Sequence, residues 1–147
     1  MNADRQSGAA GQSLIEFSIV CVMLCVIMLG VLEVGRLVLV YTTVANAARA
    51  GARYATVHGS SRTAGTGLTN ASGPAANPSQ VLTIIKDFAS AGPLTTSKLI
   101  ISVTYPGSSN APGQLVTVSV IYPYDPLTTY LPWTVRLGSI TQGVITF

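Results

Sequence analysis

The chain has 147 residues, enough for one membrane segment and one small domain, and its 8 Lys or Arg against 5 Asp or Glu give a net charge of +3. A mean hydropathy of +0.50 is typical of a protein that is partly solvated by lipid, and it excludes an ordinary soluble domain. The basic residues are scattered along the chain. Arg36, Arg49 and Arg53 could form a stripe along a helix, but three charges over about 18 residues do not make a nucleic-acid-binding surface.

The first predicted element is an apolar helix that follows a short polar leader, residues 1–11. Sixteen uncharged residues lie between Glu16 and Glu33, roughly 24 Å of helix against a hydrocarbon core of about 30 Å. Counting from Leu14 to Val34 gives the length of a spanning helix, but Glu16 then lies in or near the membrane. The only two cysteines, Cys21 and Cys25, fall in this run and are expected to pack as small apolar residues.

Three simpler kinds of N-terminal segment compete with this interpretation. A cleaved secretory signal would end in small residues of A-x-A type, but Glu33–Arg36 follows the apolar run here. A lipoprotein signal needs small residues directly before its cysteine, and neither Cys21 nor Cys25 has them. A plain signal anchor explains the hydrophobicity but not Glu16. It stays open as an alternative, in which the protein is a membrane-tethered periplasmic binding module.

Glu16 is the candidate functional residue of the anchor. An acidic side chain near hydrocarbon costs a few kcal/mol and is a functional hypothesis by default. If the chain is cut between Gly11 and Gln12, Glu16 lies one helical turn from the new α-amino group. The amine of one subunit could then pair with Glu16 of its neighbour and favour one stagger of a helical bundle.

The helix is expected to continue well beyond the membrane. No proline precedes Gly59, so one helix is predicted from about Ser13 to about Thr56. Small residues recur on one face of its second half, where they could pack against the protein's own domain or against a partner helix. They are Ala47, Ala48, Gly51, Ala52 and Ala55. Residues 59–79 are rich in Gly, Ser, Thr, Asn and Pro and predict a loop.

The remainder of the chain predicts a short amphipathic helix at residues 80–89, followed by strands at 98–105 and 114–124. The final run, 136–147, could supply one or two more strands. A turn is expected at 106–113. The 114–124 strand alternates between two rows: Leu115, Thr117, Ser119 and Ile121 against Val116, Val118, Val120, Tyr122 and Tyr124. The predicted fold class is α+β, with a long N-terminal helix against a small antiparallel sheet.

The residues after the long helix contain few candidates for a metal-binding or catalytic site. His58 is the only histidine, so a His-based zinc site lacks ligands, and at the helix end its charge could complement the helix dipole. Asp87 and Asp125 are single carboxylates with no nucleophile motif nearby, so no catalytic residue is expected. The best candidate contact surface is an aromatic cluster of which half is expected in the core. It consists of Tyr122, Tyr124, Tyr130 and Trp133.

Three motifs together resemble one known family. They are Gly11-Gln-Ser-Leu-Ile-Glu16-Phe17, then Leu32-Glu-Val-Gly-Arg36, then Thr43-Val-Ala-Asn-Ala-Ala-Arg-Ala-Gly-Ala-Arg-Tyr-Ala55. The first is the prepilin start of the type IV pilin superfamily. With the other two, the chain is similar to the TadE-like minor pilins, or pseudopilins, of tight-adherence (Tad/Flp) pilus systems over about residues 11–57.

The resemblance implies a role in assembling a pilus that serves adhesion and surface attachment. A prepilin peptidase would cleave after Gly11, so that Gln12 becomes the N-terminus of the mature chain. Glu16 and Phe17 would serve processing and assembly.

The same resemblance implies the division of the chain and its location. Residues 1–11 would be the cleaved leader, 12–35 the transmembrane part of the long helix, 36–57 its periplasmic part and 58–147 a small α+β periplasmic domain. The protein would be a single-pass protein of the bacterial inner membrane with a cytoplasmic N-terminus. Whether it also enters the extracellular pilus stays open.

The expected partners are other pilins or pseudopilins of the same system, the prepilin peptidase, the inner-membrane assembly platform and membrane lipid. No cofactor, metal, nucleic acid or small-molecule substrate is expected, and the protein is not expected to be an enzyme.

Overall fold

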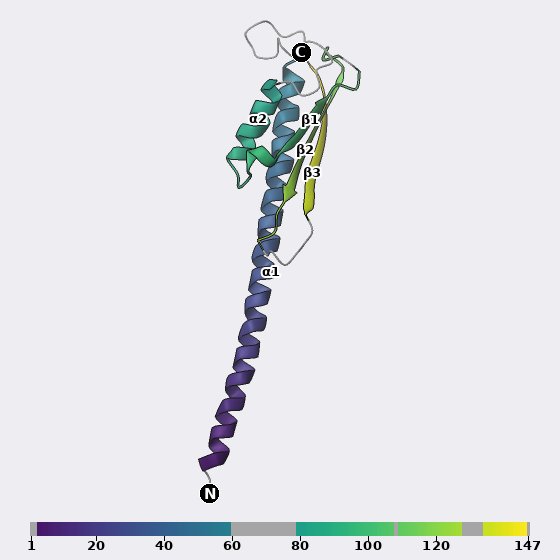
Figure 1. The fold of residues 1–147 in the computed structure, drawn as a ribbon. Helices are drawn as coiled ribbons and strands as arrows, with labels where there is room; N and C mark the ends of the chain where they lie inside the picture. Colours follow the sequence, from purple (N-terminus) through teal and green to yellow (C-terminus); the bar gives the residue numbers. More distant parts are fainter. Residues whose placement is uncertain (1–2, 60–78, 108, 128–133, 147) are drawn as a thin grey trace. The chain divides into compact units, whose positions relative to one another are not determined.

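The computed structural model describes residues 3–59, 79–107, 109–127 and 134–146, with side chains from Gly11 onward. The fold is α+β, as predicted (Figure 1). In chain order the elements are α1 (Ala3–Val57), α2 (Ser79–Ser90), the 3-10 turn η2 (Thr96–Lys98), β1 (Ile100–Thr104), β2 (Leu115–Tyr124) and β3 (Val135–Val144). The chain divides into two compact units, Met1–Arg36 and Leu37–Phe147.

The long helix α1 is confirmed, but it begins at Ala3 and not near the predicted Ser13. The residues before Ser13 include Ala, Gln and Arg, which are good helix formers, and no proline interrupts them. The helix ends at Val57, one residue after the predicted end at Thr56.

The core of the unit Leu37–Phe147 lies where α2 and the sheet pack against its part of α1 (Figure 1). Gly51 of α1 allows this close approach. A Cβ atom added there would lie 2.5 Å from Cγ1 of Ile85 in α2 and 3.6 Å from Cγ1 of Val118 in β2. The fully buried members of the core include Val44, Ala47, Ala48, Val81, Ile85, Ala89, Val103, Val116, Val118 and Val120.

The sheet is antiparallel in the order β1-β2-β3, so β2 is central. Along β2 every second residue is buried, from Val116 to Tyr124, and the row that starts at Leu115 faces away from the core. The predicted alternation is therefore confirmed. Side chains of directly opposed residues share a face, so Ile100 and Gly138 lie beside Ile121 on the outer face.

The strands differ from the prediction at their ends. β1 begins at Ile100 and not at the predicted Lys98, because Thr96–Lys98 forms a 3-10 turn, and β3 ends at Val144. The final run forms a single strand, one of the two predicted outcomes. The predicted turn at 106–113 joins β1 to β2, and Gly113 adopts a φ of 84°, which favours glycine. The predicted loop at 59–79 lies almost wholly outside the described residues.

The segment after β3 is joined to the end of α1. The backbone N–H of Thr146 donates to the carbonyl oxygen of Thr56 at 2.8 Å, and its hydroxyl donates to the same oxygen at 3.0 Å. These two bonds satisfy a carbonyl in the last turn of α1, where no intrahelical donor is available.

Candidate functional site

The predicted cleavage residues lie inside α1. Gly11, Gln12 and Glu16 line one side of the helix together with Ile15 and Ile19, because residues four apart in a helix share a face. A peptidase that binds its substrate in an extended form would first have to unwind this turn. Gly11 lowers that cost, since glycine is about 1 kcal/mol less favourable than alanine in a helix interior.

Glu16 is exposed among large apolar side chains that are exposed as well. Leu14 and Phe17 are each 70% exposed, and Ile15 is 63% exposed. A surface of this kind is stabilised by lipid or by other apolar helices. In either environment a carboxylate lacks water and requires a cation or a proton.

The apolar surface continues along α1. Every residue from 11 to 32 is exposed, and among the described residues α1 holds the one stretch, at Gly11–Val57, that is long and apolar enough to cross a bilayer. This suggests a single-pass membrane anchor. Cys21 and Cys25 are exposed free thiols on it. The Ser18 hydroxyl donates to the Ile15 carbonyl at 2.8 Å, so it is satisfied within the helix.

The small-residue face of α1 packs against the protein's own domain. Its four alanines are at most 3% exposed, and the buried Gly51 lies against Ile85 of α2 and Val118 of β2. The values are 0% for Ala47 and Ala48, 3% for Ala52 and 1% for Ala55. Of the two predicted uses of this face, packing on its own domain is therefore the one found here.

His58 closes the end of α1, directly after Val57. Its Nδ1 lies 2.8 Å from the carbonyl oxygen of Tyr54, and its ring stacks on the Tyr54 ring with centroids 4.0 Å apart. The position at a helix end agrees with the prediction.

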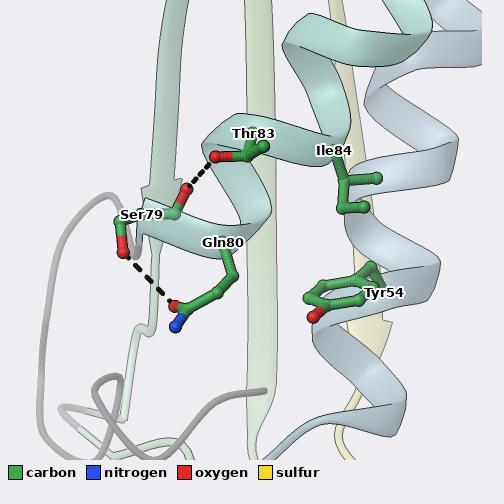
Figure 2. A pocket seen from close by; sticks show the side chains of 5 residues that line it. All are labelled: Tyr54, Ser79, Gln80, Thr83 and Ile84. Carbon is green, nitrogen blue, oxygen red and sulfur yellow. Dashed lines mark hydrogen bonds between the residues drawn. The ribbon is translucent and has the colours of Figure 1, made fainter. Parts of the chain in front are cut away.

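A shallow pocket lies between Tyr54 and the start of α2 (Figure 2). Its polar groups bond to one another: Thr83 Oγ1 donates to the Ser79 carbonyl at 3.0 Å, and Ser79 Oγ donates to Gln80 Oε1 at 3.4 Å. Ile84 completes the lining. These bonds are those of a helix start, where side chains and backbone exchange local hydrogen bonds.

Half of the aromatic cluster lies in the core, as expected. Tyr122 and Tyr124 are 8% and 2% exposed, because both belong to the inner row of β2, so they are core residues and not a contact surface. Tyr130 and Trp133 lie outside the described residues. Within the described ranges, no three His, Cys, Asp or Glu residues are grouped as a metal site requires.

Lys98 and Asp125 form an exposed ion pair with 2.5 Å between Nζ and Oδ2. The hydrogen bond to Asp125 and the charge of its carboxylate raise the pKa of Lys98. Burial raises the pKa of Tyr105. Asp87 is exposed on α2.

Arg49 and Arg53, two of the three arginines that could form a stripe along a helix, are exposed on α1. Arg49 Nη1 donates to Asn46 Oδ1 at 3.0 Å, and Arg53 lies one turn further on; all three side chains are exposed. Small buried residues dominate the sequence around them. The signal that would have revealed the exposed side is the regular spacing of three and four residues.

Comparison with known proteins supports the resemblance. Residues 11–53 match the family model described as TadE-like protein. The match includes Gly11, Gln12, Glu16 and Phe17 and ends at Arg53, so it covers under a third of the chain. No curated protein and no solved structure matches the chain.

Proposed function

We propose that the protein, with its TadE-like segment at residues 11–53, is a minor pilin (pseudopilin) that takes part in assembly of a Tad/Flp-type pilus. The observation that carries the proposal is Glu16, an exposed carboxylate in an apolar helix, one turn after the Gly11–Gln12 bond. A prepilin peptidase cleaves this bond and leaves an α-amino group on Gln12.

Charge pairing gives the proposal its mechanism. A single carboxylate in hydrocarbon is unfavourable by a few kcal/mol, and an ammonium group has the same difficulty. Pairing Glu16 of one subunit with the Gln12 amine of its neighbour removes both penalties, provided that the two groups lose water together. Since Gln12 and Glu16 are four residues apart, this pairing sets a stagger of about one helical turn between neighbours.

The proposed function also divides the chain into four parts. Residues 1–11 are the leader, 12–35 cross the inner membrane, 36–57 extend the helix into the periplasm and 58–147 form the periplasmic domain. The partners are other pilins of the system, the peptidase, the assembly platform and lipid. The proposed role is structural and not enzymatic. In it, Glu16 pairs with the amine of a neighbouring subunit and takes no part in a reaction.

Mass spectrometry of the protein purified from membranes of cells that hold the peptidase tests the cleavage. The expected mature chain begins at Gln12. A chain that keeps residues 1–11 in those cells overturns the proposal.

Two substitutions test the charge of Glu16. Glu16→Gln preserves the size of the side chain and removes its charge, so it should leave membrane insertion intact and abolish piliation. Ser18→Ala is the matched control, because the Ser18 hydroxyl bonds only within its own helix and its loss should not affect piliation. Normal piliation in Glu16→Gln would reject the pairing.

An anchor swap separates the proposal from a plain membrane tether. If residues 12–35 are replaced by an unrelated apolar helix, a tethered binding module keeps its function, whereas a pilin loses assembly.

A further inference from the structure

One stripe of α1 faces away from the core and changes from apolar to cationic along its length. Its members repeat at intervals of three, four, three and four residues, and we call them the outer stripe: Leu39, Thr42, Asn46, Arg49 and Arg53. All five are exposed, whereas the opposite side of the same turns is buried in the core. Beside Leu39, which is 50% exposed, Val38 and Tyr41 are 51% and 49% exposed.

The spacing of the outer stripe is that of a helix–helix seam. Alternating intervals of three and four residues keep a row of side chains toward a neighbouring helix that crosses at a small angle. In the sequence, the same intervals continue toward the N-terminus. The positions are Gly35, Leu32, Met28, Cys25 and Cys21.

Hydrogen bonds within α1 fix the polar side chains of the stripe at Thr42, Asn46 and Arg49. The Thr42 hydroxyl donates to the Leu39 carbonyl at 2.9 Å, so it needs no outside partner. Asn46 Oδ1 accepts from Arg49 Nη1 at 3.0 Å, which orients the guanidinium and leaves its other donors available. Among the described residues, neither Arg49 nor Arg53 forms an ion pair.

The whole outer unit has an excess of positive charge. Residues 37–147 contain six Lys or Arg and two Asp or Glu, a net charge of +4. One of the two carboxylates, Asp125, already bonds Lys98. The complementary partner surface is therefore acidic.

We infer that the outer stripe binds a helix of a different membrane-anchored chain, one that runs alongside α1 and carries Asp or Glu side chains opposite Arg49 and Arg53. This inference rests on the proposed function, because a helical bundle supplies the parallel neighbour. A second copy does not fit: two parallel copies joined through the stripe, level or one turn apart, would oppose arginine to arginine. Like charges in contact disfavour such a pairing.

Arginine suits this contact, because its planar fork binds a carboxylate through two hydrogen bonds. The apolar start of the stripe at Leu39 supplies contact area, and the two arginines select the partner and its register. The stripe thereby favours mixed over self-association.

Photo-cross-linking in native membranes tests the inference, with p-benzoylphenylalanine placed at Thr42 in the full chain. The control position is Lys86, which is exposed on α2 and outside the stripe. The expected result is a cross-link from Thr42 to a different polypeptide, mapped by mass spectrometry to a helical peptide with Asp or Glu within one turn. A cross-link to a second copy, a cross-link to phospholipid, or a yield no higher than from Lys86 overturns the inference.

Charge reversal gives a second measurement. Arg49→Glu with Arg53→Glu should lower the Thr42 cross-link yield about tenfold, which corresponds to about 1.4 kcal/mol of binding free energy. Reversal of the mapped acidic residues to Lys should restore the yield. Lys86→Glu, a reversal on α2, should leave it unchanged, and an equal loss in that variant contradicts the assignment.

The N-terminus of every sample is determined in parallel. A chain cleaved at Gln12 without the expected cross-link refutes the stripe alone, whereas an uncleaved chain refutes the proposed pilin function.

Discussion

Ile85 of α2 lies directly over Gly51 of α1. A Cβ atom at Gly51 would be 2.5 Å from Cγ1 and 2.6 Å from Cδ1 of Ile85, closer than real Cβ contacts allow. Ile85 is fully buried and its neighbours hold it in place. The two helices can therefore approach this closely only because position 51 has no side chain.

Gly51→Ala is expected to destabilise the outer unit by about 1–2 kcal/mol, since overpacking of a dense core exceeds the gain of about 1 kcal/mol in helix propensity. Urea unfolding of the full chain in detergent measures the change. Ile85→Ala alone should cost about 2–5 kcal/mol. The double variant should lose less than the sum of the two, and strict additivity would contradict the contact.

Adjacent residues of β2 should respond in opposite ways to a charge. Val118 is fully buried, whereas Ser119 is half-buried on the outer face of the sheet. Val118→Asp places an unpaired carboxylate in the core and should unfold the outer unit. Ser119→Asp should change the free energy of unfolding by about 0.5 kcal/mol or less. Protease sensitivity of the full chain distinguishes the two, and equal sensitivity would reject the assigned register.

Tyr105 should make the fold sensitive to alkali. Burial raises its pKa above 10.0, so above that pH the unfolded chain has released a proton that the folded chain still holds. The free energy of unfolding must then fall as pH rises through this range. Tyr105→Phe removes the contribution and should flatten the fall, whereas near neutral pH the difference between the proteins should be constant. An unchanged slope in the variant would show that another group is responsible.

The ion pair of Lys98 and Asp125 should be visible in a titration. Asp125→Asn removes the acceptor charge, so the pKa of Lys98 should return toward its usual 10.5. Heteronuclear NMR of the lysine side chains measures this shift. The pair is about half exposed, so added salt should lower the Lys98 pKa in the parent protein and not in the variant. The stability that the pair contributes is present below the usual pKa of lysine and is lost as pH rises through the raised value.

Apolar periodicity predicted most of the fold. The alternation in β2 identified its core-facing row from Val116 to Tyr124, and the long unbroken apolar pattern identified α1. Local effects were harder to predict. Because a 3-10 turn ends at Lys98, β1 begins later than predicted. The helix extends into the leader before Ser13 because no proline interrupts it there. The small-residue pattern marked Gly51 as a position for close packing, but it did not identify Ile85 as the partner, because the two residues are distant in the sequence.

The candidate site, too, could be predicted from the sequence only in part. Gly11 and Glu16 could be identified because an acid in an apolar helix is conspicuous. The sequence suggested that Arg49 and Arg53 could belong to a stripe along a helix. It could not show that both are exposed, because their exposure depends on which side of α1 the sheet covers.

The bonds between Thr146 and Thr56 connect residues 90 positions apart. The ribosome synthesises all of α1 long before it reaches Thr146, which bonds the end of that helix. The central strand β2 is likewise synthesised before β3, the strand that pairs with it. The domain consequently cannot reach its native state during synthesis of its first two-thirds. At elongation rates of about 5–20 residues per second, the end of α1 in a nascent chain lacks its bonds to Thr146 for several seconds or more.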